Sequence, residues 1–90
     1  MDEVAVKNII RDTLEYRLTK ETIKGEEVWC YAREYGDYVP INYITEDEID
    51  MLRNDCWDDA LYEFDEDDLD IDIFDELFDE VFYDEMMWGK

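Results

Sequence analysis

The stretch DEDDLDIDIFDELFDE, residues 65–80, combines ten carboxylates with six large apolar side chains and contains no lysine or arginine. The fold depends on whether this stretch is a solvated tail or part of a domain. Between Phe64 and Trp88, 13 of 25 residues are large and apolar. Disordered acidic segments contain few large apolar residues, and they therefore cannot bury enough apolar surface to fold. We therefore expect the acidic stretch to fold.

The apolar period changes within the stretch. Asp68 to Ile73 alternates between acidic and apolar residues, which predicts an extended segment. From Phe74 to Met86 the spacing becomes helical, which predicts a helix with Asp72 as its N-cap. The apolar positions of this helix are Phe74, Leu77, Phe78, Val81 and Phe82.

Upstream of the stretch, residues 1–44 indicate a helix followed by strands. Apolar residues recur at helical spacing from Asp2 to about Leu18. Three β-rich segments follow, separated by turns at Lys24-Gly25 and Gly36-Asp37: Thr19 to Ile23, Glu26 to Glu34 and Tyr38 to Ile44. Pro40 cannot donate a hydrogen bond to a neighbouring strand, so the last strand is expected at a sheet edge.

ITEDEI, residues 44–49, predicts the start of a second long helix. Thr45 and Glu48 have the spacing of a capping box, which starts the helix at Glu46 and lets it run to about Phe64. The chain is thus predicted to be one α+β domain over residues 1–90. Its order is an N-terminal helix, a three-stranded antiparallel sheet, then two acidic helices with a short extended segment between them. Residues 1–54 hold the first helix, the sheet and the start of the second helix, and residues 55–90 form the acidic helical half.

The charge restricts the classes of partner. The formal net charge is −21, and residues 55–90 contain 16 acids against Lys90 alone, whereas residues 1–54 contain 13 acids and 7 bases. Such a chain repels nucleic acids and anionic membranes and attracts basic surfaces. The sequence contains no His, Ser or Gln, which excludes histidine bases, serine nucleophiles and imidazole metal sites. We expect no catalysis, no cofactor and no metal.

Two further features concern the compartment. The sequence has no apolar run of the roughly 18 residues that a membrane span needs, and MDEVAV lacks the features of a signal peptide. We therefore expect a cytoplasmic protein. Cys30 and Cys56 show no metal-binding or redox spacing, which indicates reduced, partly buried thiols, although a disulfide between them stays open.

The absence of bases from the acidic stretch lowers the stability of the fold, which indicates that the negative charge has a function. A wholly helical acidic stretch would contain seven like-charge i, i+4 pairs, which together cost about 1.5 to 3.5 kcal/mol. Rows of carboxylates on a strand and a helix would average one charge per roughly 3 Å, close to the phosphate spacing of DNA at about 3.4 Å per strand. The sequence therefore predicts a rigid surface with the charge density of a nucleic acid.

This pattern of acidic rows on a small α+β domain resembles the DNA-mimic inhibitors of phages and mobile elements, including small anti-CRISPR proteins that occupy the PAM-reading cleft of RNA-guided nucleases. The resemblance covers chiefly residues 55–88. It implies a non-catalytic inhibitor whose partner is a basic DNA-binding protein of the host, with a CRISPR effector slightly preferred over a restriction nuclease. A homodimer stays open. The resemblance and the charge pattern together predict these contact carboxylates: Asp58, Asp59, Glu63, Asp65, Glu66, Asp67, Asp68, Asp70, Asp72, Asp75, Glu76, Asp79, Glu80 and Asp84.

Three alternatives stay open at this stage. One is an acidic-hydrophobic activation segment that folds only on a partner. Another is calcium binding, because Asp68, Asp70 and Asp72 imitate the first ligands of an EF-hand loop, although Ile73 stands where that loop needs Gly. The third is an enzyme with paired carboxylates, of the kind that glycosidases use.

Overall fold

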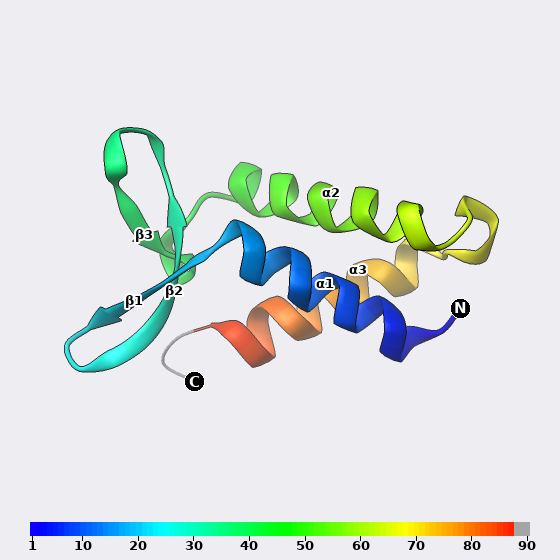
Figure 1. The fold of residues 1–90 in the computed structure, drawn as a ribbon, viewed down its shortest axis with the longest axis horizontal. Coiled ribbons are helices and arrows are strands. Elements are labelled where there is room, and N and C mark those ends of the chain that lie inside the picture. Colours follow the sequence, from blue (N-terminus) through cyan, green and yellow to red (C-terminus); the bar gives the residue numbers. More distant parts are fainter. Residues whose placement is uncertain (88–90) are drawn as a thin grey trace.

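The computed structural model describes residues 1–87, without the side chain of Tyr35, and shows helices beside a small sheet (Figure 1). Short 3₁₀ turns connect several elements, and the molecule is elongated, measuring 43 × 27 × 19 Å. The predicted α+β class is confirmed. The elements are α1 (Glu3–Arg17), β1 (Thr19–Ile23), β2 (Glu26–Ala32), β3 (Tyr38–Pro40), α2 (Glu46–Glu63), α3 (Ile71–Asp79) and a π-helical segment (Glu80–Met86).

Side-chain caps explain where α1 and α2 begin. Asp2 Oδ1 accepts a hydrogen bond from the Ala5 amide at 3.2 Å. At α2, Thr45 Oγ1 accepts from the Glu48 amide at 3.2 Å, while Glu48 Oε1 accepts from the Thr45 amide at 2.9 Å. The capping box that the sequence predicts is therefore formed, and each bond satisfies an amide that has no partner within its helix.

The sheet has the predicted antiparallel order β1-β2-β3, with β3 at an edge. Lys24 and Gly25 both have positive φ angles, 53° and 83°, as a two-residue hairpin turn requires. Two strands are shorter than predicted. β2 ends at Ala32, before a 3₁₀ turn at Glu34–Gly36, and β3 ends at Pro40, since the chain turns again over Ile41–Tyr43.

The extended segment predicted over residues 68–73 is confirmed only at Leu69 and Asp70. Residues 66–68 form a 3₁₀ turn and α3 begins at Ile71, so extended backbone occurs only beside that turn. The N-cap is Asp70 rather than Asp72, because Asp70 Oδ1 accepts from the amides of Asp72 and Ile73 at 2.9 and 3.3 Å. Ile71, although apolar, is 52% exposed. The alternation was too short to separate a strand from the first turn of a helix.

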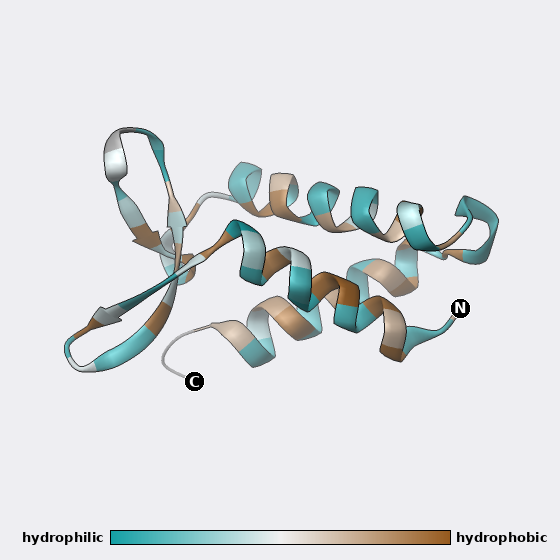
Figure 2. Cartoon of the chain, in the orientation of Figure 1, coloured by the Kyte–Doolittle hydropathy of each residue, from teal (hydrophilic) through white to brown (hydrophobic). Residues whose placement is uncertain are grey.

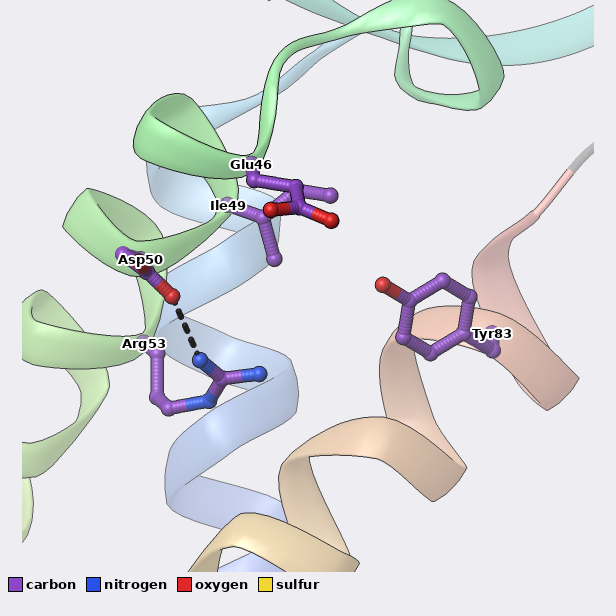
Figure 3. Close-up of a pocket in the computed structure, with 5 residues that line it drawn as sticks. All are labelled: Glu46, Ile49, Asp50, Arg53 and Tyr83. Carbon is purple, nitrogen blue, oxygen red and sulfur yellow. Dashed lines mark hydrogen bonds and ion pairs between the residues drawn. The ribbon is translucent and has the colours of Figure 1, made fainter.

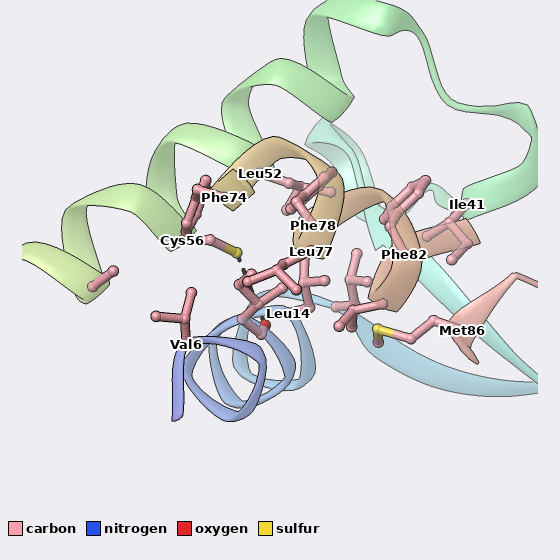
Figure 4. Packing of buried hydrophobic residues seen from close by; sticks show 14 of the residues in the cluster. Val6, Leu14, Ile41, Leu52, Cys56, Phe74, Leu77, Phe78, Phe82 and Met86 are labelled. Atoms are coloured by element: carbon pink, nitrogen blue, oxygen red, sulfur yellow. Dashed lines mark hydrogen bonds between the residues drawn. The ribbon is translucent and has the colours of Figure 1, made fainter. Parts of the chain in front are cut away.

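The apolar face of the acidic stretch lies inside the protein, as predicted (Figure 4). α1 and α2 run in opposite directions, and α3 with its π-helical continuation packs against them (Figure 1). Phe74, Phe78 and Phe82 are fully buried. Trp57 of α2 meets Phe74 edge to face with 5.0 Å between ring centroids. Aromatic burial on this scale anchors the acidic segment to the two longer helices.

Both cysteines are free thiols, and both are fully rather than partly buried. Cys56 lies in the core beside α1, where its Sγ is 3.9 Å from the carbonyl oxygen of Ile10. Burial raises the pKa of the Cys56 thiol to about 12. The thiol is therefore protonated and unreactive at neutral pH, which indicates a packing role.

Candidate functional site

The fourteen predicted contact carboxylates all belong to the second half of α2, to the connection after it, or to α3 and its continuation. Thirteen of them are exposed and Asp75 is partly buried. The ion pairs place twelve of the fourteen in two regions with different surroundings. The carboxylates of one region form no ion pair with a base among residues 1–87, and those of the other are paired with bases on α1 and α2.

The first region, which we call the acidic end, comprises the carboxylates of residues 58–72. No described basic side chain forms an ion pair with any of them. This surface lies at the end of the molecule opposite the sheet, where α2 turns into α3, and Figure 2 shows hydrophilic residues over that turn. Its members are Asp58, Asp59, Glu63, Asp65, Glu66, Asp67, Asp68, Asp70 and Asp72.

The acidic end is held by local structure. Asp59 Oδ2 accepts a hydrogen bond from the Thr13 hydroxyl at 2.7 Å, which ties α2 to α1. Asp70 caps α3, and the 3₁₀ turn Glu66–Asp68 is closed by a bond of 2.9 Å from the Asp68 amide to the Asp65 carbonyl. A 3₁₀ turn rises about 2 Å per residue, so this turn carries charges more densely along its axis than one DNA strand does.

Arg53 of α2 supplies the partner for part of the second region. Its guanidinium lies 2.7 Å from Asp50, 3.3 Å from Asp79 and 3.5 Å from Asp75, and Figure 3 shows it in a pocket with Asp50. Arg53 Nε and Asp75 Oδ1 are both shielded from water but make no hydrogen bond. Their attraction is therefore one of charge alone. The guanidinium also lies over the ring of Phe78, with 4.9 Å from Cζ to the centroid.

The π-helical segment forms ion pairs with α1. Lys7 Nζ lies 2.9 Å from Glu80 and 3.6 Å from Glu85. Arg11 donates two hydrogen bonds to Glu85, from Nε at 2.6 Å and from Nη2 at 2.9 Å. The wider π turn allows residues five apart, Glu80 and Glu85, to reach the same lysine.

The pKa directions agree with this pairing. The hydrogen bond to Glu80 is the main cause that raises the pKa of Lys7. The hydrogen bond to Glu85 raises the pKa of Arg11, and the same bond lowers the pKa of Glu85. Three predicted contact residues, Asp75, Asp79 and Glu80, are thus engaged within the chain.

Two predicted contact residues lie outside both regions. Glu76 and Asp84 are exposed, Glu76 on α3 and Asp84 on the π-helical segment. Asp68, Asp70 and Asp72 span a 3₁₀ turn and the start of α3 rather than a loop. No cluster of three potential ligands for a metal ion is found within residues 1–87.

Asp12 of α1 is an acidic residue that the sequence did not predict at this surface. Asp12, Asp59 and Glu63 line one shallow depression between α1 and α2, together with Ile9, Thr13 and Tyr62. The available signal was the helical spacing of Asp12 relative to the buried residues of α1, which places it beside the core-facing stripe. Its neighbours on α2 depend on how the two helices are aligned, and the sequence does not give that alignment.

The comparisons add no relative. Nothing matches this chain among protein-family models, curated proteins or solved structures. No helix within residues 1–87 combines the length and apolar character that a bilayer crossing needs. The function is therefore argued from the surface itself.

Proposed function

We propose that this protein is a non-catalytic DNA mimic that occupies the basic nucleic-acid site of a host protein. The observation that carries the proposal is the acidic end: nine carboxylates over residues 58–72, without an ion pair to any described base. A folded chain that leaves so many like charges unneutralised accepts a cost in stability. When a basic groove binds this surface, the counterions of both are released into solution, and that release would offset the cost.

The burial of the aromatic residues supports this proposal over an activation segment. An activation segment presents its Phe side chains to a partner and orders them only there. In this protein Phe74, Phe78 and Phe82 are fully buried against the chain's own helices. They are therefore engaged in the fold and are not exposed for a partner. What remains on the surface of this half is chiefly charge.

Ion pairs within the chain indicate which carboxylates are available for contact. Asp75, Asp79 and Glu80 already have basic partners, so the acidic end should contribute most of the binding energy. A host nuclease is the preferred target class, and a CRISPR effector is slightly preferred over a restriction enzyme because of the resemblance to small anti-CRISPR proteins. A protein with this role would work in the cytoplasm of the host cell.

The test is capture followed by competition. Immobilised protein is incubated with a bacterial lysate at about 50 mM salt and eluted at about 500 mM, since Debye screening should release a partner held by charge. The eluted proteins should bind labelled duplex DNA, and adding the free protein should displace that DNA. A complex that holds DNA and this protein together would contradict the proposal. So would a set of captured proteins that bind no nucleic acid.

A further inference from the structure

Every cation over an aromatic ring in residues 1–87 is also held by a carboxylate. Arg53 lies over Phe78 and pairs with Asp79 at 3.3 Å. Arg17 of α1 lies 5.8 Å from the centroid of Tyr16 and 3.6 Å from Asp55 of α2. A guanidinium suits this arrangement because its flat face stacks on a ring while its edge donates to a carboxylate.

The same arrangement recurs at the sheet. Lys20 Nζ lies 5.0 Å from the centroid of Trp29 and 3.4 Å from Glu27 Oε2. Three cations on three elements are therefore held in one way, by a ring and an acid together. A ring beside acids that lacks a cation is then a place where a cation from outside would fit.

Tyr62 is such a ring. It is 88% exposed, the highest value among the large apolar and aromatic side chains of the described residues. Its side chain borders two depressions: one is lined also by Asp58 and Leu61, and the other by Asp12, Asp59 and Glu63. None of these acids forms an ion pair with a described base.

The depression on the α1 side is built by both long helices. Asp12 comes from α1, and Asp59 and Glu63 come from α2. The Thr13 hydroxyl donates a hydrogen bond of 2.7 Å to Asp59 Oδ2, which holds this carboxylate between the two helices. The volume is about 270 Å³, below the range of about 300 to 1,000 Å³ typical of pockets for small molecules. The charged end of a long basic side chain suits walls that carry three carboxylates and an aromatic ring.

We propose that this depression receives an arginine side chain of the basic partner. The guanidinium stacks on Tyr62 and donates to Asp12, Asp59 or Glu63, repeating the internal arrangement of Arg17 and Arg53. The inference rests on the proposed function for the basic character of the partner. It adds that the partner is recognised through arginine in particular, where a lysine-rich surface of equal charge would bind less well.

The experiment compares two probes of equal charge, nona-arginine and nona-lysine, by titration into ¹⁵N-labelled protein at about 50 mM salt. Lysine can also lie over a ring, as Lys20 does over Trp29, but only a guanidinium can stack on the ring and donate two hydrogen bonds from its edge, so we expect a roughly two- to fivefold preference for nona-arginine. Nona-arginine should shift the amide signals of Asp12, Thr13 and Tyr62 most. Tyr62→Ala should remove the preference, and Tyr62→Phe should keep it because the ring remains.

The matched control is Tyr43→Ala. Tyr43 is 69% exposed and lies in the 3₁₀ turn before α2, at the sheet end of that helix. This variant should leave the preference unchanged. Equal binding of the two probes, or a preference that survives Tyr62→Ala, overturns the inference. If both probes bind equally and shift the amide signals of residues 65–68, the proposed arginine site at Tyr62 is ruled out, while the proposed function stands. If neither probe binds, the arginine site and the proposed function are both ruled out.

Discussion

The acidic end and the paired carboxylates are made of the same residue types, but they differ in their neighbours. Glu80 and Glu85 on the π-helical segment reach Lys7 and Arg11 of α1. The carboxylates of residues 58–72 reach no described base. Three bases, Lys7, Arg11 and Arg53, thus join α1 and α2 to the last helical run, and no base lies in the turn between α2 and α3. Carboxylates therefore form ion pairs that join the helices in one region, whereas in the other region they have no ion-pair partner within residues 1–87.

Charge reversal should separate the two regions most clearly. Glu66→Lys, Asp67→Lys and Asp68→Lys together replace three unpaired acids that have no side-chain role in a cap. Binding to a captured partner should weaken about 100-fold or more, since attraction becomes repulsion at three positions. Competition against labelled DNA measures the loss. The control reverses Glu21, Glu34 and Asp37 at the sheet end, and an equal loss in this control would show that only net charge matters.

Removal of Arg53 should have the next largest effect, and it should fall on stability. Arg53→Leu leaves Asp50, Asp75 and Asp79 close together without their shared cation. The free energy of unfolding should fall by about 2 to 3 kcal/mol, because the side chain is only 26% exposed and its removal leaves partly buried charge uncompensated.

Urea denaturation measures this change. Lys24→Asn removes the same charge at an exposed turn position whose positive φ Asn tolerates, and it should change stability by about 0.5 kcal/mol or less. A loss in Lys24→Asn as large as that in Arg53→Leu would contradict the role assigned to the ion pairs of Arg53.

Some features of the fold follow from local sequence patterns, and others depend on contacts between residues far apart in the sequence. The capping box at Thr45 and the helical stripe from Phe74 to Phe82 follow from local spacing, and both are confirmed. The start of α3 was misplaced because Leu69, Ile71 and Ile73 alternate over too few residues. The cap at Asp70 overrides that alternation.

The sequence could not predict which carboxylates form ion pairs within the chain and which do not. Lys7 meets Glu80 across 73 positions of sequence, and Arg53 meets Asp79 across 26. Such pairs depend on helix alignment and on the π turn, neither of which leaves a local pattern. The charge pattern therefore located the acidic half correctly, but it treated all of its carboxylates as equivalent.

A smaller effect is expected at the other end of the molecule. The hydrogen bond from Arg33 is the main cause that lowers the pKa of Glu48 to about 2. A lowered pKa stabilises the folded state above the unfolded value of about 4.3, and this stability is lost as pH falls toward 2. Because Arg33 is exposed, solvent screening limits the contribution to about 1 kcal/mol or less at pH 7.

Glu48→Gln isolates this contribution, since Gln can still complete the capping box. The stability difference between the parent protein and Glu48→Gln should be full at pH 7 and should vanish between about pH 4.3 and pH 2. Thermal melts followed by circular dichroism across that range measure it. A difference that does not depend on pH would show that the ion pair with Arg33 contributes nothing to folding.

The central claim is that buried aromatic side chains hold the acidic stretch in one fixed arrangement. Amide hydrogen exchange followed by NMR tests it most directly, by comparing Phe74 to Phe78 of α3 with Ile10 to Leu14 of α1. We predict that the two sets exchange at rates within about tenfold of each other, because both open only when the shared core unfolds. Exchange of the α3 amides at the rate of an unfolded chain, with α1 still protected, would contradict the account.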